Sequence, residues 1–75
     1  MKIKPNTDLR RADLRGAKLE GADLHGADLY QANMVGADLY RAKLAGATMD
    51  FANLRGADLR KADLRRANMK KSNLS

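Results

Sequence analysis

Few side chains in this 75-residue sequence could do chemistry, and those few do not form a recognisable set. His25 is the only histidine, there is no cysteine, and the only serines are Ser72 and Ser75. A metal site needs several ligands that converge on one ion, and nucleophilic hydrolysis needs a base and an acid beside the serine. The sequence supplies neither set. It therefore predicts a protein that is not an enzyme and that has no catalytic, metal-binding or cofactor-binding residues.

The acidic side chains recur at a fixed spacing, which predicts a structural role for them. An Asp or Asn precedes the central Leu or Met in eleven of fourteen five-residue segments, the exceptions being Lys18, Lys43 and Thr48. Short carboxylate and amide side chains accept hydrogen bonds from nearby backbone N–H groups and so stabilise turns. We therefore expect these side chains to support the backbone rather than to transfer protons.

The element that must position these groups is a five-residue repeat from Thr7 to Leu74. An apolar residue recurs at every fifth position, and Ala stands two residues earlier in twelve of the fourteen copies. In an α-helix this period would step around all sides and leave no apolar face. In an extended strand, residues two apart point to one side, so Ala and Leu face an interior and the next two residues turn the chain. The predicted structural core is Leu9, Leu14, Leu19, Leu24, Leu29, Met34, Leu39, Leu44, Met49, Leu54, Leu59, Leu64, Met69 and Leu74.

Glycine is frequent at the second turning position, where the chain is expected to bend sharply. Glycine is permissive at tight corners, although Arg11, Arg41, Lys61 and Arg66 indicate that it is not required there. The six repeats that end in glycine do so at Gly16, Gly21, Gly26, Gly36, Gly46 and Gly56.

The motif, alanine followed by Asp or Asn, Leu and two variable residues, closely resembles the pentapeptide-repeat family over residues 7–74. The resemblance implies an all-β fold, a right-handed quadrilateral parallel β-helix with four repeats to a coil and about three and a half coils. Residues twenty apart should then stack on one another, for example Gly16, Gly36 and Gly56. Residues 7–75 are predicted to form this β-helix. Residues 1–6 are predicted to form an N-terminal cap or tail in which Ile3 covers the first coil.

The net charge of +6 is concentrated near the C-terminus, where residues 51–75 hold seven Lys or Arg and two Asp. These cations are expected to surround the last coil as a basic collar, formed by Arg55, Arg60, Lys61, Arg65, Arg66, Lys70 and Lys71. One interpretation is a solvated face. The other is non-specific, salt-sensitive binding of nucleic acid or another anionic surface.

The aromatic residues suggest a contact surface. Phe51 occupies an outward turning position where Gly or a charge is usual, and Tyr30 and Val35 are not far away in sequence. A single exposed aromatic residue is also normal. Tyr30 and Tyr40 should lie two faces apart, so they cannot form one stacking platform. The predicted interaction surface comprises Tyr30, Phe51, Arg60, Lys61, Arg65, Arg66, Lys70 and Lys71.

The leading functional prediction is a non-enzymatic structural or protein-interaction module, a rigid β-helical rod with an unknown protein partner. Unpaired strand edges at the open C-terminal coil favour a closed homodimer. The best-understood relatives imply a further class, gyrase-interacting mimics of DNA, which needs a negative rod rather than a net charge of +6. So regular a repeat also fits an engineered scaffold.

The sequence predicts a cytoplasmic protein with no membrane partner. The first six residues are too few and too polar for the apolar region of a signal peptide. No apolar run approaches the length that spans a membrane.

Overall fold

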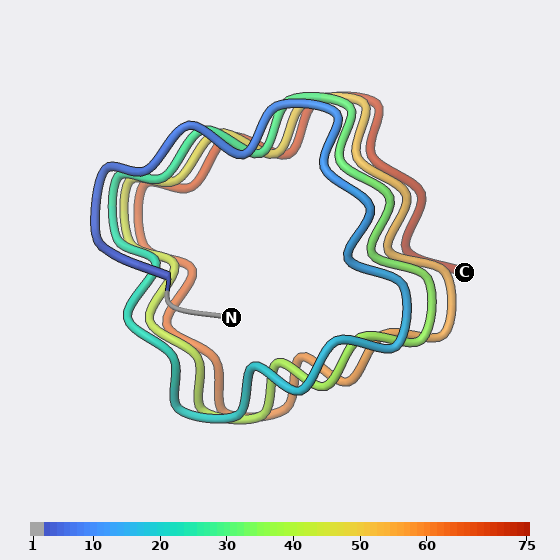
Figure 1. Cartoon of the computed structure of the whole chain (residues 1–75), viewed down its shortest axis with the longest axis horizontal. Coiled ribbons are helices and arrows are strands. Elements are labelled where there is room, and N and C mark those ends of the chain that lie inside the picture. Colours follow the sequence, from blue (N-terminus) through green and yellow to red (C-terminus); the bar gives the residue numbers. More distant parts are fainter. Residues whose placement is uncertain (1–2) are drawn as a thin grey trace.

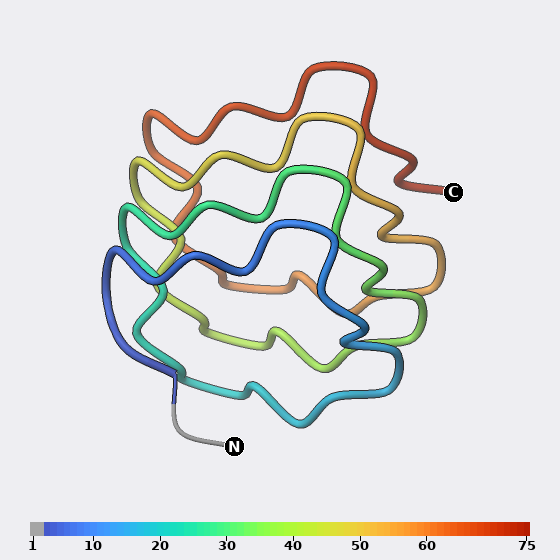
Figure 2. The same cartoon turned by 45° about the horizontal axis from the view of Figure 1, so that its top comes forward.

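A computed structural model describes residues 3–75 of the chain; Met1 and Lys2 of the predicted cap lie outside the described residues. Viewed down its shortest axis, the backbone follows a four-sided outline, and successive coils lie over one another (Figure 1). The tilted view shows the same coils stacked along the axis (Figure 2). The extents are 24 × 22 × 20 Å, so the molecule is a short block rather than the expected rod. The reason is that each coil adds only about 4.8 Å of length.

Every corner of the outline is a β-turn that brings the central residue of one repeat to the Ala of the next. The N–H of Ala32 donates to the carbonyl of Leu29 at 2.9 Å, and that of Ala37 to the carbonyl of Met34 at 3.0 Å. The last residue of each repeat, from Arg11 to Lys71, has φ between 54° and 70°. A type II turn requires a positive φ at this position. Glycine and non-glycine repeats therefore make the same corner.

The Asp and Asn side chains support these corners, as the sequence predicts. Asp38 Oδ1 accepts the N–H of Tyr40 at 3.1 Å, and Asn53 Oδ1 accepts the N–H of Arg55 at 3.1 Å. Both side chains therefore satisfy a backbone donor at the start of a turn, whereas the N–H of Lys70 donates to Asp50 Oδ1 on the neighbouring coil.

Backbone pairing joins residues twenty apart, in the parallel orientation, as Asp28 pairs with Asp8 on one side and with Thr48 on the other. The N–H of Leu29 donates to the carbonyl of Thr48 at 2.6 Å, and the N–H of Asp28 to that of Thr7 at 2.9 Å. This is the twenty-residue stacking that the sequence predicts. The bridges form four columns, one to a side: 8/28/48/68, 13/33/53/73, 18/38/58 and 23/43/63.

The pairing consists of isolated bridges and not of the longer strands that an all-β description suggests. Between residues 3 and 75, each side of the coil pairs through a single residue, and no helix or multi-residue strand is present. The cause is the turn in every five residues, which leaves too few extended residues for a longer strand. This part of the chain accordingly contains no helix with the length and apolar character needed to cross a membrane.

The core is a stack of Leu, Met and Ala side chains inside the coils. The residues from Leu24 to Leu54 at the central repeat position are at most 1% exposed. At the ends Leu9, Leu59, Leu64 and Met69 are half-buried, and Ile3 packs against the core. The prediction that Leu74 belongs to the core is wrong, because this residue is 57% exposed. It lies on the last coil, where the described residues leave it open to solvent.

Candidate interaction surface at the first corner

The outward positions of four stacked repeats form one continuous ridge along the axis. The N–H of Arg11 donates to the carbonyl of Tyr30 at 2.8 Å, that of Gln31 to Asp50 at 3.0 Å, and that of Phe51 to Lys70 at 2.8 Å. These bonds place the four pairs of turn residues directly over one another. We call this ridge the first corner; it consists of Arg10, Arg11, Tyr30, Gln31, Asp50, Phe51, Lys70 and Lys71.

The first corner carries a full side chain at every left-handed position. Arg11, Gln31, Phe51 and Lys71 have φ of 59°, 56°, 61° and 54°. Next along the chain, the second corner holds Gly at all three of its left-handed positions, at φ of 63° to 70°. The left-handed conformation costs a non-glycine residue roughly 1–2 kcal/mol. The first corner is therefore built from residues that its own backbone geometry disfavours.

Two aromatic rings meet at the middle of this ridge. The rings of Tyr30 and Phe51 lie 5.7 Å apart between centroids, with an interplanar angle of 73°, an edge-to-face arrangement. Tyr30 is half-buried, whereas Phe51 is 46% exposed. The Nζ atom of Lys71 lies 6.0 Å from the centroid of Phe51, on the far side from the N-terminal coil. An apolar surface thus lies open to solvent beside a cation.

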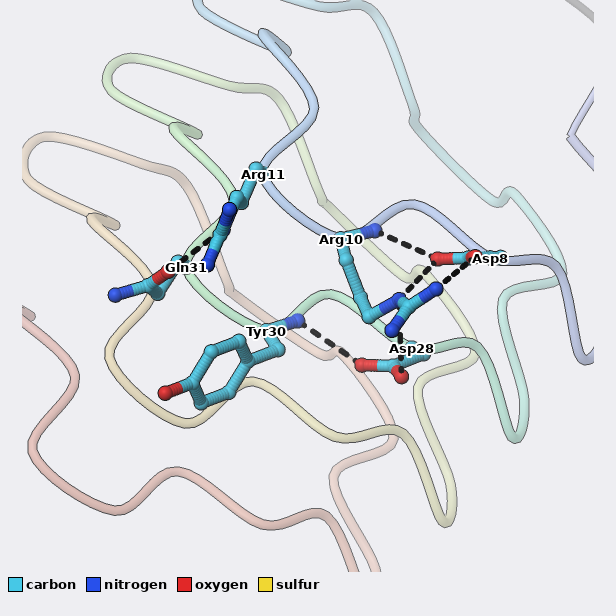
Figure 3. Close-up of polar contacts among 6 residues, drawn as sticks. All are labelled: Asp8, Arg10, Arg11, Asp28, Tyr30 and Gln31. Carbon is cyan, nitrogen blue, oxygen red and sulfur yellow. Dashed lines mark hydrogen bonds and ion pairs between the residues drawn. The ribbon is translucent and has the colours of Figure 1, made fainter.

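The N-terminal part of the first corner is polar (Figure 3). Arg10 donates to both oxygens of Asp8, from Nε at 2.8 Å and from Nη2 at 2.7 Å, and its Nε lies 3.9 Å from Asp28 Oδ2. Arg11 Nε donates to Gln31 Oε1 at 3.0 Å. An open depression lies between these groups and Tyr30. The two arginines therefore differ, since Arg10 pairs with a carboxylate and Arg11 with a neutral amide.

The pairing of Arg10 with Asp8 lowers the pKa of the carboxyl to about 2, chiefly through the side-chain hydrogen bond from Arg10. The same i, i+2 arrangement recurs at Arg15, Arg60 and Arg65, each with the Asp two residues before it. All these carboxylates are ionised at neutral pH. Each of these arginines consequently has its charge compensated on its own repeat.

The structure divides the predicted basic collar into paired and unpaired cations. Arg60 and Arg65 are held by Asp58 and Asp63 at 2.8 and 2.7 Å. The others form no ion pair with the described residues; they are Arg55, Lys61, Arg66, Lys70 and Lys71. The collar residues occupy all four sides of the coil, as expected. Only Lys70 and Lys71 share the first corner with Tyr30 and Phe51.

Tyr40 and its two cation–π contacts lie on another side of the coil. The guanidinium carbons of Arg41 and Arg60 each lie 5.3 Å from the centroid of the Tyr40 ring. Arg60, a predicted member of the interaction surface, therefore contacts Tyr40 and Asp58. It lies apart from Tyr30 and Phe51, and these two partners explain the position of its side chain.

The histidine and serine side chains, which could act in catalysis or metal binding, are engaged in local hydrogen bonds. His25 Nδ1 lies 2.9 Å from Asp23 Oδ1 on the surface. Ser72 Oγ donates to the carbonyl of Met69 at 2.8 Å, and Ser75 Oγ to Asn73 Oδ1 at 2.6 Å. Within residues 3–75, no three His, Asp or Glu side chains are grouped closely enough to hold a metal ion.

Sequence reasoning missed Gln31 and the participation of Arg11, which it considered as a residue that replaces Gly at a corner. The signal was present in the spacing. Positions 11, 31, 51 and 71 are twenty apart and none is Gly, whereas positions 16, 36 and 56 are all Gly. Reading the corners as columns would have identified the first corner as exceptional.

The comparisons with known proteins agree with this architecture. The family model for pentapeptide repeats matches residues 7–46 and 37–75, with eight copies. A pentapeptide repeat protein from the thylakoid lumen of Arabidopsis thaliana is 35% identical, with 93% of this chain and 52% of that chain covered and a TM-score of 0.56. The pentapeptide repeat protein Rfr23 from the cyanobacterium Cyanothece 51142 is 35% identical, with 92% and 54% covered and a TM-score of 0.58. The chain spans about half the length of these two proteins. No curated protein matches the sequence.

Proposed function

Because the chain belongs to the pentapeptide repeat family, whose solved members are right-handed β-helices, we propose that it is a non-enzymatic protein-interaction module. Four repeats to a coil give about three and a half coils in a quadrilateral prism. The bridges between residues twenty apart support this count. A prism filled by its own Leu, Met and Ala side chains has rigid outer faces. The first corner is the face that contacts an unknown protein partner.

Phe51 is the observation that carries this proposal. The residue is 46% exposed although its backbone has a φ of 61°, at which Gly is the favoured residue. Tyr30 packs edge-to-face against the ring, and the Nζ atom of Lys71 lies 6.0 Å from its centroid. A half-exposed aromatic residue offers a large contact area, and aromatic residues are enriched at the centres of interfaces.

Site-specific photocrosslinking tests the role of the first corner. One variant carries p-benzoylphenylalanine in place of Phe51, and the control carries it in place of Tyr40, on another side of the coil. In extracts of the source organism, we expect a discrete adduct from position 51 and not from position 40. The partner is then identified by mass spectrometry, purified and tested for binding. Equal adducts from both positions, or none from position 51, would contradict the proposal.

Anion binding by the basic collar is a second candidate. It is favoured by the cations that form no ion pair within residues 3–75, Lys61, Arg66, Lys70 and Lys71 among them. If these four contact phosphates, the affinity for duplex DNA should fall roughly 50-fold between 50 and 150 mM salt, because the logarithmic slope is about −0.9 per contact. Arg66→Gln should weaken binding more than Arg65→Gln, since Asp63 already compensates Arg65. Absence of binding at both salt concentrations would exclude this candidate. A gyrase-binding mimic of DNA is disfavoured by the net charge of +6.

A closed homodimer through the C-terminal end is a further proposal. Leu74 is 57% exposed there, and the N–H groups of Leu64 and Met69 donate to no backbone carbonyl of the described residues. Pairing two such ends would cover both the apolar residues and the backbone donors. Light scattering should then give about twice the chain mass of 8.2 kDa, and the mass of one chain would contradict the dimer.

A further inference from the structure

The cations of the first corner lie at its two ends, with the aromatic pair between them. Arg10 and Arg11 stand on the first coil and Lys70 and Lys71 on the last, whereas Asp50 is the only acid at the outward positions of this corner. Asp50 Oδ1 accepts the backbone N–H of Lys70 at 3.0 Å, so part of its capacity is used locally. The ridge therefore has cations at both ends, and its middle holds the aromatic pair beside Asp50. Asp8 and Asp28 lie next to Arg10 at the N-terminal end, so the positive charge that remains there is that of Arg11.

Arg11 at one end, and Lys70 and Lys71 at the other, make no ion pair with the described residues, and Arg11 and Lys71 occupy the same position of the repeat. Arg11 donates from Nε to the neutral side chain of Gln31, so its charge is not compensated. Lys71 lies beside the Phe51 ring and makes no ion pair with the described residues. Arg10, in contrast, is neutralised by Asp8. Arg11 and Lys71 are thus the two groups that a pair of carboxylates would approach.

The spacing of these groups matches an extended peptide. Parallel strands lie about 4.8 Å apart, so the three coil steps from Arg11 to Lys71 span about 14 Å along the axis. In an extended chain, side chains on one side recur about every 6.8 Å, so the first, third and fifth residues also span about 14 Å. The third residue then lies about 7 Å from either end, level with the junction of Tyr30 and Phe51.

We propose that the first corner binds an extended acidic segment of a partner protein, in which one bulky apolar residue alternates with two flanking carboxylates. The carboxylates pair with Arg11 and Lys71, and the apolar side chain packs on the exposed part of Phe51. This inference rests on the proposed function, since it names the chemistry of the partner at the same surface. A single exposed ring, edge-to-face with a half-buried one, offers no platform for successive bases, so single-stranded nucleic acid is the less suitable occupant.

Amide NMR titration with synthetic peptides tests the inference at 150 mM salt. The probe is the capped peptide Gly-Asp-Ser-Phe-Ser-Asp-Gly. One control, Gly-Asp-Asp-Phe-Ser-Ser-Gly, has the same composition but both acids at one end; another replaces the Phe of the probe with Ala. We expect saturable shifts centred on residues 11, 31, 51 and 71, binding at least threefold weaker for the rearranged peptide, and tenfold weaker for the Ala peptide. Equal affinities for the three peptides, or shifts spread around the basic collar, would overturn the inference.

Matched variants separate the surface from the overall charge. Phe51→Gly should weaken binding of the probe at least tenfold, whereas Arg41→Gly, also at a left-handed position but on the third side, should change it less than twofold. An equal effect of the two variants would overturn the inference. Tighter binding of an oligothymidylate than of the peptide at the first corner would also overturn it. If the peptide fails but a crosslinked partner still requires Phe51, the acidic segment is wrong and the proposed function stands. If that partner binds Phe51→Gly normally, both are wrong.

Discussion

Replacing Phe51 by Gly and by Ala separates the cost of its backbone conformation from the value of its contacts. Both substitutions remove the ring and with it the edge-to-face contact with Tyr30, worth about 0.5–1.5 kcal/mol beyond burial. Only Gly relieves the left-handed conformation at φ 61°, which costs a non-glycine residue roughly 1–2 kcal/mol. Gly also gives up about 0.4–1 kcal/mol through the larger entropy of its unfolded chain. The Gly variant should therefore unfold with a free energy about 0.5–1 kcal/mol higher than that of the Ala variant.

Urea denaturation followed by far-ultraviolet circular dichroism measures this difference. At a typical slope of about 1 kcal/mol per molar urea, the midpoint of Phe51→Gly should lie about 0.5–1 M above that of Phe51→Ala. Tyr30 is the control, because its φ is not positive; there the Ala variant should be the more stable of the two. Equal midpoints at position 51, or a more stable Ala variant, would refute the claim that the first corner places side chains in a disfavoured conformation.

Three further predictions follow from the core, the corners and the ion pairs. Leu39→Ala, at 0% exposure, should lower the free energy of unfolding by about 2–5 kcal/mol. Leu74→Ala, at 57% exposure, should lower it by less than about 1 kcal/mol. Similar losses for the two variants in urea denaturation would contradict the assigned core. Gly36→Ala should lower the free energy of unfolding by about 0.5–1 kcal/mol. The cause is φ of +67° alone, because an added Cβ meets no heavy atom within 4 Å. An unchanged urea midpoint would argue against the left-handed corner. The hydrogen bond from Arg60 lowers the pKa of Asp58 from 3.8 to about 2, so its stabilising effect is complete above the ordinary value and is lost as pH falls toward 2. A carboxyl carbon NMR titration should show this midpoint at low salt, and one near 3.8 would disprove the pair.

The fold could be predicted because the period of the repeat and the spacing of its apolar residues fit only one kind of backbone. An apolar residue at every fifth position is incompatible with an apolar helix face, and an Ala two residues earlier matches an extended segment. Asp38 and Asn53 accept the backbone N–H groups of Tyr40 and Arg55, as their residue types suggest. Twenty-residue stacking followed from the family resemblance and agrees with the bridges.

The surface could not be predicted as well, because it depends on three-dimensional neighbours. The sequence places Tyr30 near Phe51 only loosely, and the coil length together with the direction of both side chains brings their rings to 5.7 Å. The pairing of charges within the collar also depends on the fold, since Asp58 and Asp63 compensate Arg60 and Arg65 on their own repeats. Local i, i+2 pairing is visible in the sequence, but its geometry depends on the turn.

The left-handed φ of Phe51 was also beyond the sequence. A glycine at a corner indicates that a positive φ is allowed, whereas a bulky residue at the equivalent position ordinarily argues against it. The structure gives Phe51 a φ of 61° and Gly56 a φ of 70°, because both corners have the same turn and the same backbone hydrogen bond to the next coil. Tertiary pairing therefore overrides the preference of the residue.

The claim on which the fold, the first corner and the proposals all depend is that residues twenty apart lie side by side. Nuclear Overhauser contacts in the uniformly labelled protein test it most directly. We predict backbone contacts between Asp28 and Thr48, and between the other bridged pairs, with contacts between the rings of Tyr30 and Phe51. A series of backbone contacts between residues three and four apart, typical of an α-helix, without the twenty-residue contacts, would contradict the account.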